Sequence, residues 1–260
     1  MASILNISAY KFVGLPDAQD LRPTLHELAQ ALDLKGTVLL AEEGINLFLA
    51  GSAESVRAWV AALHRDPRFA DISPKESWSE NVPFKKLLVK FKPEIIRMNH
   101  PAIRPDAQER APAIRPLDLA RWLDQGHDDA GRPVVMLDTR NGFEVDYGAF
   151  DDAIDWRITK FSEFPQAAQE HLADLEGKTV VSYCTGGIRC EKAAIVLQQM
   201  GLNAFQLEGG ILKYFEETQS APHYHGGCFV FDEREALGTA LQPSSLIDRP
   251  ASEAHRAKKD

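Results

Sequence analysis

The second half of the chain contains the stretch Thr179-Val180-Val181-Ser182-Tyr183-Cys184-Thr185-Gly186-Gly187-Ile188-Arg189-Cys190-Glu191-Lys192. A short apolar run ends at a cysteine, two glycines follow, and a helical pattern begins directly afterwards. The Cys184 thiol is therefore expected at the carboxyl end of a strand and over the N-terminus of a helix. Loop N–H groups and the helix dipole both favour a thiolate there. The pattern predicts a reactive nucleophile; the alternative is a buried, inert thiol.

Short apolar strands alternate with helices on both sides of this stretch. Strands are expected at 134–138, 179–183 and 204–207, and helices at 116–125, 164–174, 189–200 and 211–217. This alternation predicts an α/β domain at 117–240 with a parallel sheet covered on both faces. Functional groups gather beyond the carboxyl ends of such strands, where Asp138 and Arg140 are expected beside Cys184.

Residues 1–97 predict a separate α+β domain. Strands are expected at 4–13, 36–40, 45–50, 72–78 and 86–91, and helices at 21–32 and 52–63. A β-α-β-β-α-β order with one extra strand predicts a ferredoxin-like, or acylphosphatase-like, sandwich. Residues 98–116 contain four prolines and are expected to form an extended linker. Residues 241–260 are polar and are expected to be disordered.

Composition restricts the classes of protein to which this chain can belong. The 260 residues are 44% hydrophobic and 26% charged, without an apolar run near the roughly 18 residues of a membrane span. The N-terminus lacks the pattern of a signal peptide, and three cysteines do not suggest a disulfide framework, so a cytoplasmic protein is expected. The net charge of −9 does not predict a nucleic-acid partner, so any basic surface must be local.

One segment is locally basic. Between residues 82 and 104, a single acidic residue opposes six basic ones: Lys85, Lys86, Lys90, Lys92, Arg97 and Arg104. Phe84 and Phe91 in the same segment are able to stack on bases. Taken alone, the run is better explained as a solvated strand edge on which lysines discourage aggregation.

Several strings resemble known families. Residues 181–190 resemble the active-site loop of a rhodanese domain, Asp138-Thr139-Arg140-Asn141 through Gly148 resemble its Asp-x-Arg signature, and residues 207–211 resemble its later Gly-Gly turn. The longer string Cys-Thr-Gly-Gly-Ile-Arg-Cys-Glu-Lys at 184–192 is more specific. Together with residues 44–46, 83–86 and 227–234, it resembles the oxygen-dependent tRNA uridine hydroxylases, which are rhodanese-domain proteins. The resemblance covers roughly residues 1–240.

This resemblance implies 5-hydroxylation of the wobble uridine in the tRNA anticodon, with molecular oxygen as co-substrate and a loop cysteine as the essential group. Carried onto this chain, that cysteine is Cys184. The loop continues through Thr185, Gly186, Gly187, Ile188, Arg189 and Cys190. Beside the resemblance, RNA contact becomes the favoured interpretation of Lys85, Lys86, Lys90, Lys92 and Arg97.

The loop side chains have two interpretations each. Arg189 either stabilises charge or contacts phosphate, or it ties the loop to Asp138 or Glu191. Cys190 is favoured as a small packed residue over a resolving thiol. Asp138 and Arg140 are expected to brace the end of the sheet.

Other functions remain open. A sulfurtransferase carrying a persulfide on Cys184 would use the same loop, and a non-catalytic rhodanese domain would act as a binding module. A phosphatase is disfavoured because Cys184 to Arg189 gives C-x4-R, one residue short of the C-x5-R phosphate cradle. His223, His225 and Cys228 offer three possible metal ligands at unusual spacing without a fourth nearby, so a structural loop is favoured over a metal site. No nucleotide or flavin motif occurs, and no cofactor is expected.

Overall fold

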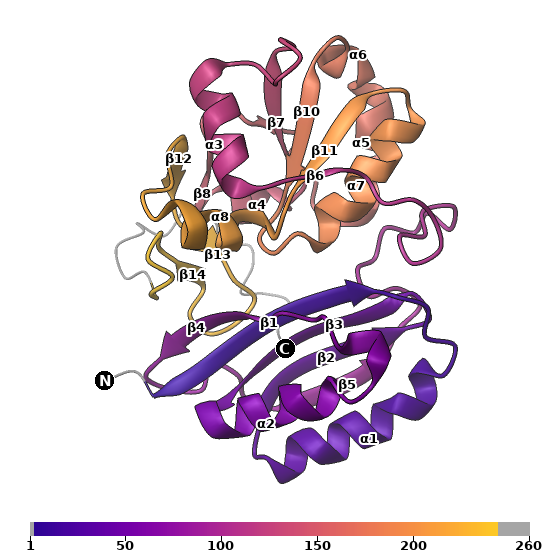
Figure 1. Cartoon of the computed structure of the whole chain (residues 1–260), viewed down its shortest axis with the longest axis vertical. Coiled ribbons are helices and arrows are strands. Elements are labelled where there is room, and N and C mark those ends of the chain that lie inside the picture. Colours follow the sequence, from indigo (N-terminus) through magenta and orange to yellow (C-terminus); the bar gives the residue numbers. More distant parts are fainter. Residues whose placement is uncertain (1–2, 244–260) are drawn as a thin grey trace.

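The computed structural model describes residues 3–243 and contains two α/β units, one stacked above the other (Figure 1). The N-terminal unit lies below in the view of Figure 1, and the second unit lies above it. Most of the segment expected to be disordered, residues 244–260, lies outside the described residues.

The N-terminal unit is a five-stranded sheet with two helices. Its elements are β1 (Ile4–Phe12), α1 (Ala18–Ala31), β2 (Lys35–Ala41), β3 (Gly44–Ser52), α2 (Ala53–Leu63), the 3-10 helix η1 (Pro67–Phe69), β4 (Lys75–Ser79) and β5 (Leu87–Phe91). The strand order is β4-β1-β3-β2-β5. The first four strands have the ferredoxin-like arrangement, and β5 adds a parallel neighbour to β2. The expected sandwich with one extra strand is therefore confirmed.

The two helices cover only one face of this sheet (Figure 1). Ser52 begins α2 by accepting a hydrogen bond from the Ser55 N–H at 3.1 Å. Behind this cap, Val56 and Trp59 are buried against the sheet. The opposite face is directed toward the second unit, and it carries Asn6, Ser8, Tyr10, Asn46 and Phe48 along a cavity between the two units.

The second unit is built around a parallel sheet of order β6-β11-β10-β7-β9. Its elements are β6 (Ala113–Ile114), α3 (Pro116–Gln125), β7 (Val134–Asp138), α4 (Gly142–Val145), β8 (Gly148–Phe150), β9 (Ile154–Asp155), the 3-10 helix η2 (Phe161–Glu163), α5 (Phe164–Glu170), α6 (Leu172–Leu175), β10 (Thr179–Tyr183), α7 (Ile188–Gln199), β11 (Asn203–Leu207), α8 (Gly210–Thr218), β12 (Tyr224–Gly226), β13 (Cys228–Phe229) and β14 (Ala236–Leu237). Separate apolar clusters lie on its two faces. The prediction of a parallel sheet covered on both faces is confirmed.

Two segments differ from the expectations. The helix expected at 164–174 is divided into α5 and α6 at His171, whose ring stacks on Trp156. The proline-rich segment at 98–116 is not a free spacer, because Met98, Ile103 and Ala111 are buried in the core of the second unit. Its last residues form β6, which pairs with β11 at the edge of the sheet. The burial of these isolated apolar residues was not predicted, because a proline-rich segment lacks the hydrophobic periodicity from which burial is predicted.

Candidate active site

Cys184 follows β10 directly and is 1% exposed. The N–H of Gly187 donates to the Cys184 sulfur at 3.2 Å, and Gly187 has φ 104°, a conformation that favours glycine. The first turn of α8 closes the loop from the other side, because the Ile211 N–H donates to the Cys184 carbonyl at 2.9 Å. A Cβ on Gly210 would collide with that carbonyl oxygen. The two Gly-Gly turns therefore hold one tightly packed loop.

The surroundings of Cys184 favour its ionised form. Burial by itself would raise the pKa of Cys184. The adjacent Cys190 thiol, the positive charge of Arg189 and the backbone N–H groups of both residues outweigh burial and hold this pKa well below its ordinary value. The loop thus combines one thiolate with the donors that stabilise it.

Arg189 is held by a residue that the sequence did not single out. Its two terminal nitrogens donate to the carboxylate oxygens of Glu144 at 2.6 and 2.7 Å. Both side chains are buried, and Glu144 also accepts the Asn141 N–H at the start of α4. The expected partners, Asp138 and Glu191, are therefore wrong: Glu144 orients Arg189, which still lines the cavity with Cys184. The Asn141–Glu144 capping box was the available sequence signal.

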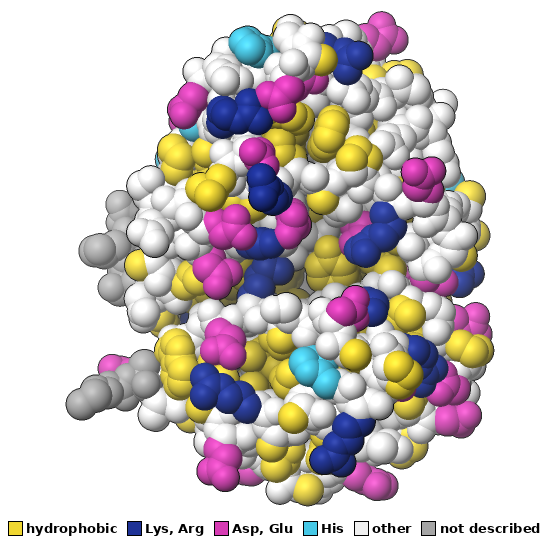
Figure 2. All heavy atoms as spheres, viewed as in Figure 1, with side chains coloured by type: hydrophobic (Ala, Val, Ile, Leu, Met, Phe, Trp, Pro, Cys, Tyr) yellow, Lys and Arg dark blue, Asp and Glu magenta, His cyan; other side chains and the backbone are white. Residues whose placement is uncertain are grey.

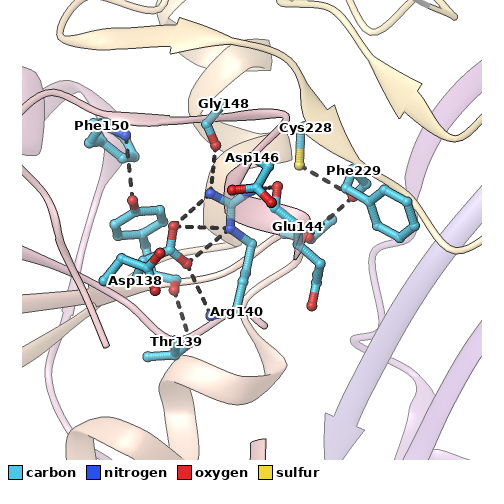
Figure 3. Close-up of polar contacts among 12 residues, drawn as sticks. Asp138, Thr139, Arg140, Glu144, Asp146, Gly148, Phe150, Cys228 and Phe229 are labelled. Atoms are coloured by element: carbon cyan, nitrogen blue, oxygen red, sulfur yellow. Dashed lines mark hydrogen bonds and ion pairs between the residues drawn. The ribbon is translucent and has the colours of Figure 1, made fainter. Parts of the chain in front are cut away.

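Asp138 and Arg140 form a second, deeper ion pair. Both side chains are fully buried, and Arg140 donates to the Asp138 carboxylate at 2.6 and 2.9 Å. Arg140 also donates to the Gly148 carbonyl at 2.7 Å, as Figure 3 shows. Thr139 bonds to the Tyr183 carbonyl through its N–H at 3.0 Å and its hydroxyl at 2.9 Å. These contacts join the ends of β7 and β10 immediately before the cysteine loop.

A cavity of about 460 Å³ lies between the two units, with Cys184 in its wall. Residues of the loop, of the open face of the first sheet and of the segment after β13 line it. Its basic lining residues are Lys75, Arg97, Lys160, Arg189 and Arg234. Figure 2 shows apolar side chains mixed with basic and acidic ones along the boundary between the units. A volume of this size accommodates a nucleoside-sized ligand.

The N-terminal unit reaches the loop through two side chains. The Lys75 ammonium donates to the Gly186 carbonyl at 3.1 Å, and burial lowers its pKa. The Tyr10 hydroxyl donates to the Glu191 carboxylate at 3.0 Å, and a Cβ on Gly187 would approach this hydroxyl to 2.9 Å. Sequence reasoning missed Lys75 and Tyr10, because no local pattern connects residues of different domains.

Glu191 and Lys192, the last two residues of the string at 184–192, form contacts that connect the two units. Lys192 is 1% exposed, and its ammonium contacts Glu43 at 2.8 Å and Glu94 at 2.7 Å. Glu191 forms an ion pair with Arg110 besides accepting from Tyr10. The helix that starts at the reactive loop is therefore also the helix on which the N-terminal unit is anchored.

The basic residues between positions 85 and 97 do not lie together in the structure. Arg97 and Phe84 line the cavity. Lys85 is 87% exposed and lies 3.6 Å from Glu233, whereas Lys90 and Lys92 lie on β5 and just after it, near Arg22 of α1. Lys86 is exposed at the start of the same edge strand. These contacts leave the RNA-binding role of the four lysines a prediction.

The histidine-rich segment is bound into the second unit. His223 contacts Asp124 at 2.7 Å, and His225 contacts Asp151 at 3.2 Å. Cys228 is fully buried, which raises its pKa to about 12. Among residues 3–243, no group of three metal-binding side chains is assembled, and no helix is long and apolar enough to cross a membrane.

A parallel α/β sheet with a cradled cysteine thiolate defines a rhodanese-type domain, here preceded by an acylphosphatase-like domain. Sequence comparison agrees: residues 4–95 match the UPF0176 acylphosphatase-like domain, and residues 118–217 match the rhodanese-like domain.

Three proteins called tRNA uridine(34) hydroxylase are similar to this chain over nearly their whole length. That of Delftia acidovorans is 68% identical, covering 95% of this chain and 93% of the relative. That of Bordetella avium is 65% identical over 93% and 99%, and that of Variovorax paradoxus is 61% identical over 100% and 97%. The chain belongs to the tRNA uridine(34) hydroxylase family and is an enzyme.

Proposed function

We propose that this enzyme hydroxylates C5 of the wobble uridine of tRNA, with molecular oxygen as co-substrate and Cys184 as nucleophile. The observation that carries the proposal is a cysteine whose surroundings favour ionisation, in the wall of a nucleoside-sized cavity and in a chain closely similar to the tRNA uridine(34) hydroxylases. The proposal places the enzyme in the cytoplasm with its tRNA substrate.

The chemistry begins with conjugate addition. C6 of uracil is electrophilic because the C4 carbonyl withdraws electrons through the double bond, so the Cys184 thiolate adds at C6. The addition places negative charge on C5 and O4, and C5 then donates an electron pair to oxygen. Lys75 and Arg189 line the same cavity and supply positive charge toward the developing oxyanion. One oxygen atom remains on C5.

The cavity also offers groups for the rest of the anticodon. Phe231 lines it and is 54% exposed, which gives an aromatic surface on which a base can stack. Arg97 and Lys160 are further lining residues able to contact phosphates. Lys85, Lys86, Lys90 and Lys92 extend the basic surface along the N-terminal unit, where they would add a salt-dependent attraction to tRNA.

Sulfur transfer is the second candidate, and one observation favours it: residues 118–217 match the rhodanese-like domain. A thiolate cradled by loop N–H groups would hold a persulfide as readily as it attacks uracil. The nucleoside product distinguishes the two reactions.

The test compares the purified enzyme with C184S and C228S, using an unmodified tRNA with a wobble uridine. Mass spectrometry of the nucleosides should show 5-hydroxyuridine with wild type and C228S, but none with C184S. The Cys228 thiol is a matched control because it is also buried and free but lies outside the loop. Normal 5-hydroxyuridine from C184S contradicts the proposal, and a thiolated nucleoside in place of the hydroxylated one supports sulfur transfer.

A further inference from the structure

Oxygen-dependent hydroxylation leaves two electrons to be supplied. Converting C5–H to C5–OH releases two electrons, whereas complete reduction of oxygen to one hydroxyl oxygen and one water consumes four. A donor of two electrons and two protons is therefore needed in each cycle. Two thiols that become a disulfide supply this amount.

The loop contains a second thiol in the required place. The sulfur of Cys190 lies 3.7 Å from the sulfur of Cys184, and both residues are buried. The two sulfurs are thus in contact, and forming a bond between them requires an approach to about 2 Å. The intervening residues include Gly186 and Gly187, the two positions of the loop without side chains.

The two cysteines differ in protonation state. The Cys190 thiol donates to the Gly187 carbonyl at 3.0 Å. Burial and the adjacent Cys184 thiolate raise the pKa of Cys190 well above its ordinary value. Cys184 is therefore the thiolate that faces the cavity, and Cys190 is the protonated thiol behind it. Within the described residues, the cavity lining includes Cys184 and not Cys190, so Cys190 reaches the reaction only through Cys184.

We propose that Cys190 is the resolving thiol of the hydroxylation and that the Cys184–Cys190 pair is its two-electron donor. The inference rests on the proposed function, because it assigns the reductant of that reaction.

Each step of the proposed reaction balances in atoms and electrons. The Cys184 thiolate adds to C6, C5 bonds to oxygen, and the resulting peroxide anion takes a proton to give a C5 hydroperoxide. Loss of the C5 proton expels Cys184 and restores the double bond. The freed thiolate attacks the outer peroxide oxygen, so that the O–O bond breaks, Cys184 becomes a sulfenic acid, and the remaining oxyanion takes a proton to give 5-hydroxyuridine. Cys190 then attacks the Cys184 sulfur, an S–S bond replaces the S–O bond, and hydroxide leaves with the Cys190 proton as water.

The sum is uridine, oxygen and two thiols giving 5-hydroxyuridine, water and one disulfide. An external dithiol, either a small molecule or a reducing protein, regenerates the pair by thiol–disulfide exchange. That exchange would begin at Cys184, because Cys184 lines the cavity and Cys190 does not.

The experiment tests whether the two cysteines of the wild-type enzyme supply the two electrons. The enzyme is reduced, freed of thiols under nitrogen, and mixed with wobble-uridine tRNA and air. The inference predicts about one 5-hydroxyuridine per chain, a mass decrease of two hydrogens, and a Cys184–Cys190 peptide. Adding dithiothreitol should restore multiple turnovers. Product formation without this disulfide overturns the inference while leaving the hydroxylation intact.

Variants give an independent readout. C190A should accumulate a Cys184 sulfenic acid that dimedone traps, and its turnover at limiting thiol should fall at least about 10-fold, whereas C228S should behave as wild type. C190A without a trappable sulfenic acid and with wild-type turnover contradicts the resolving role. If wild type forms no 5-hydroxyuridine even with dithiothreitol, or if C184S forms it, the proposed function itself fails.

Discussion

The charge of Arg189 should set the range of pH over which Cys184 is reactive. Removing Arg189 alone would leave Glu144 buried and unpaired, so the informative variant is the double substitution R189M/E144Q, which removes both charges. Glutamine retains an acceptor for the Asn141 N–H, and methionine retains much of the buried volume. The loop N–H groups and the Cys190 thiol remain in place, so only the electrostatic contribution is lost.

The expected magnitude follows from the titration of a thiol. A neighbouring opposite charge lowers the pKa of an acid by about 1–3 units. The double variant removes the charge of Arg189 together with the opposing charge of Glu144, so it should raise the Cys184 pKa by at most that amount. In wild type the thiolate should persist to lower pH than that of an ordinary thiol, because the surroundings of Cys184 hold its pKa well below the ordinary value. An unperturbed thiol of pKa about 8.5 loses about 200-fold in thiolate between pH 9 and pH 6. We therefore expect a nearly flat wild-type profile and a profile for the variant that falls as pH decreases.

The assay is the rate of iodoacetamide alkylation from pH 5 to pH 9, followed by intact mass and peptide mapping. Cys228 is the internal control, because burial raises its pKa to about 12 and it should remain unmodified. A wild-type rate that rises tenfold with each pH unit would refute the thiolate assignment. Identical profiles for wild type and the double variant would refute the role of Arg189.

Three further results are expected. K192M should lower the free energy of unfolding by about 3–5 kcal/mol, because it leaves the two acidic partners of a buried cation unpaired. A thermal or denaturant transition unchanged from wild type would contradict the anchoring role. F231A should raise KM for tRNA about 5- to 150-fold with kcat unchanged, which corresponds to the loss of about 1–3 kcal/mol of base stacking. L117A also removes an exposed apolar side chain, so it is the control and should have no effect. Equal KM values for wild type and F231A would exclude stacking at this position. K85A/K86A should reduce the slope of log affinity for tRNA against log salt by about 1–2, and an unchanged slope would place these lysines outside the interface.

The sequence predicted those features that depend on neighbouring residues. Strand-to-helix alternation gave the parallel sheet, and an apolar run followed by Cys184 and two glycines gave the reactive loop. Contacts between distant segments have no such pattern: Glu144 is 45 residues from Arg189, and Lys75 is 111 residues from Gly186. The anchoring contacts of Glu191 with Tyr10 and of Lys192 with Glu43 depend in the same way on partners in another domain.

The proposed function requires that attack by Cys184 at C6 makes C5 of the wobble uridine react with molecular oxygen. Its most direct test is the reaction of the reduced enzyme with unmodified tRNA under 18O-labelled oxygen gas, with C184S in parallel and the labels exchanged in labelled water. The 5-hydroxyuridine made by wild type should contain one heavy oxygen from labelled gas and none from labelled water, and C184S should form no product. Oxygen derived from water, or labelled product from C184S, would contradict the proposed function.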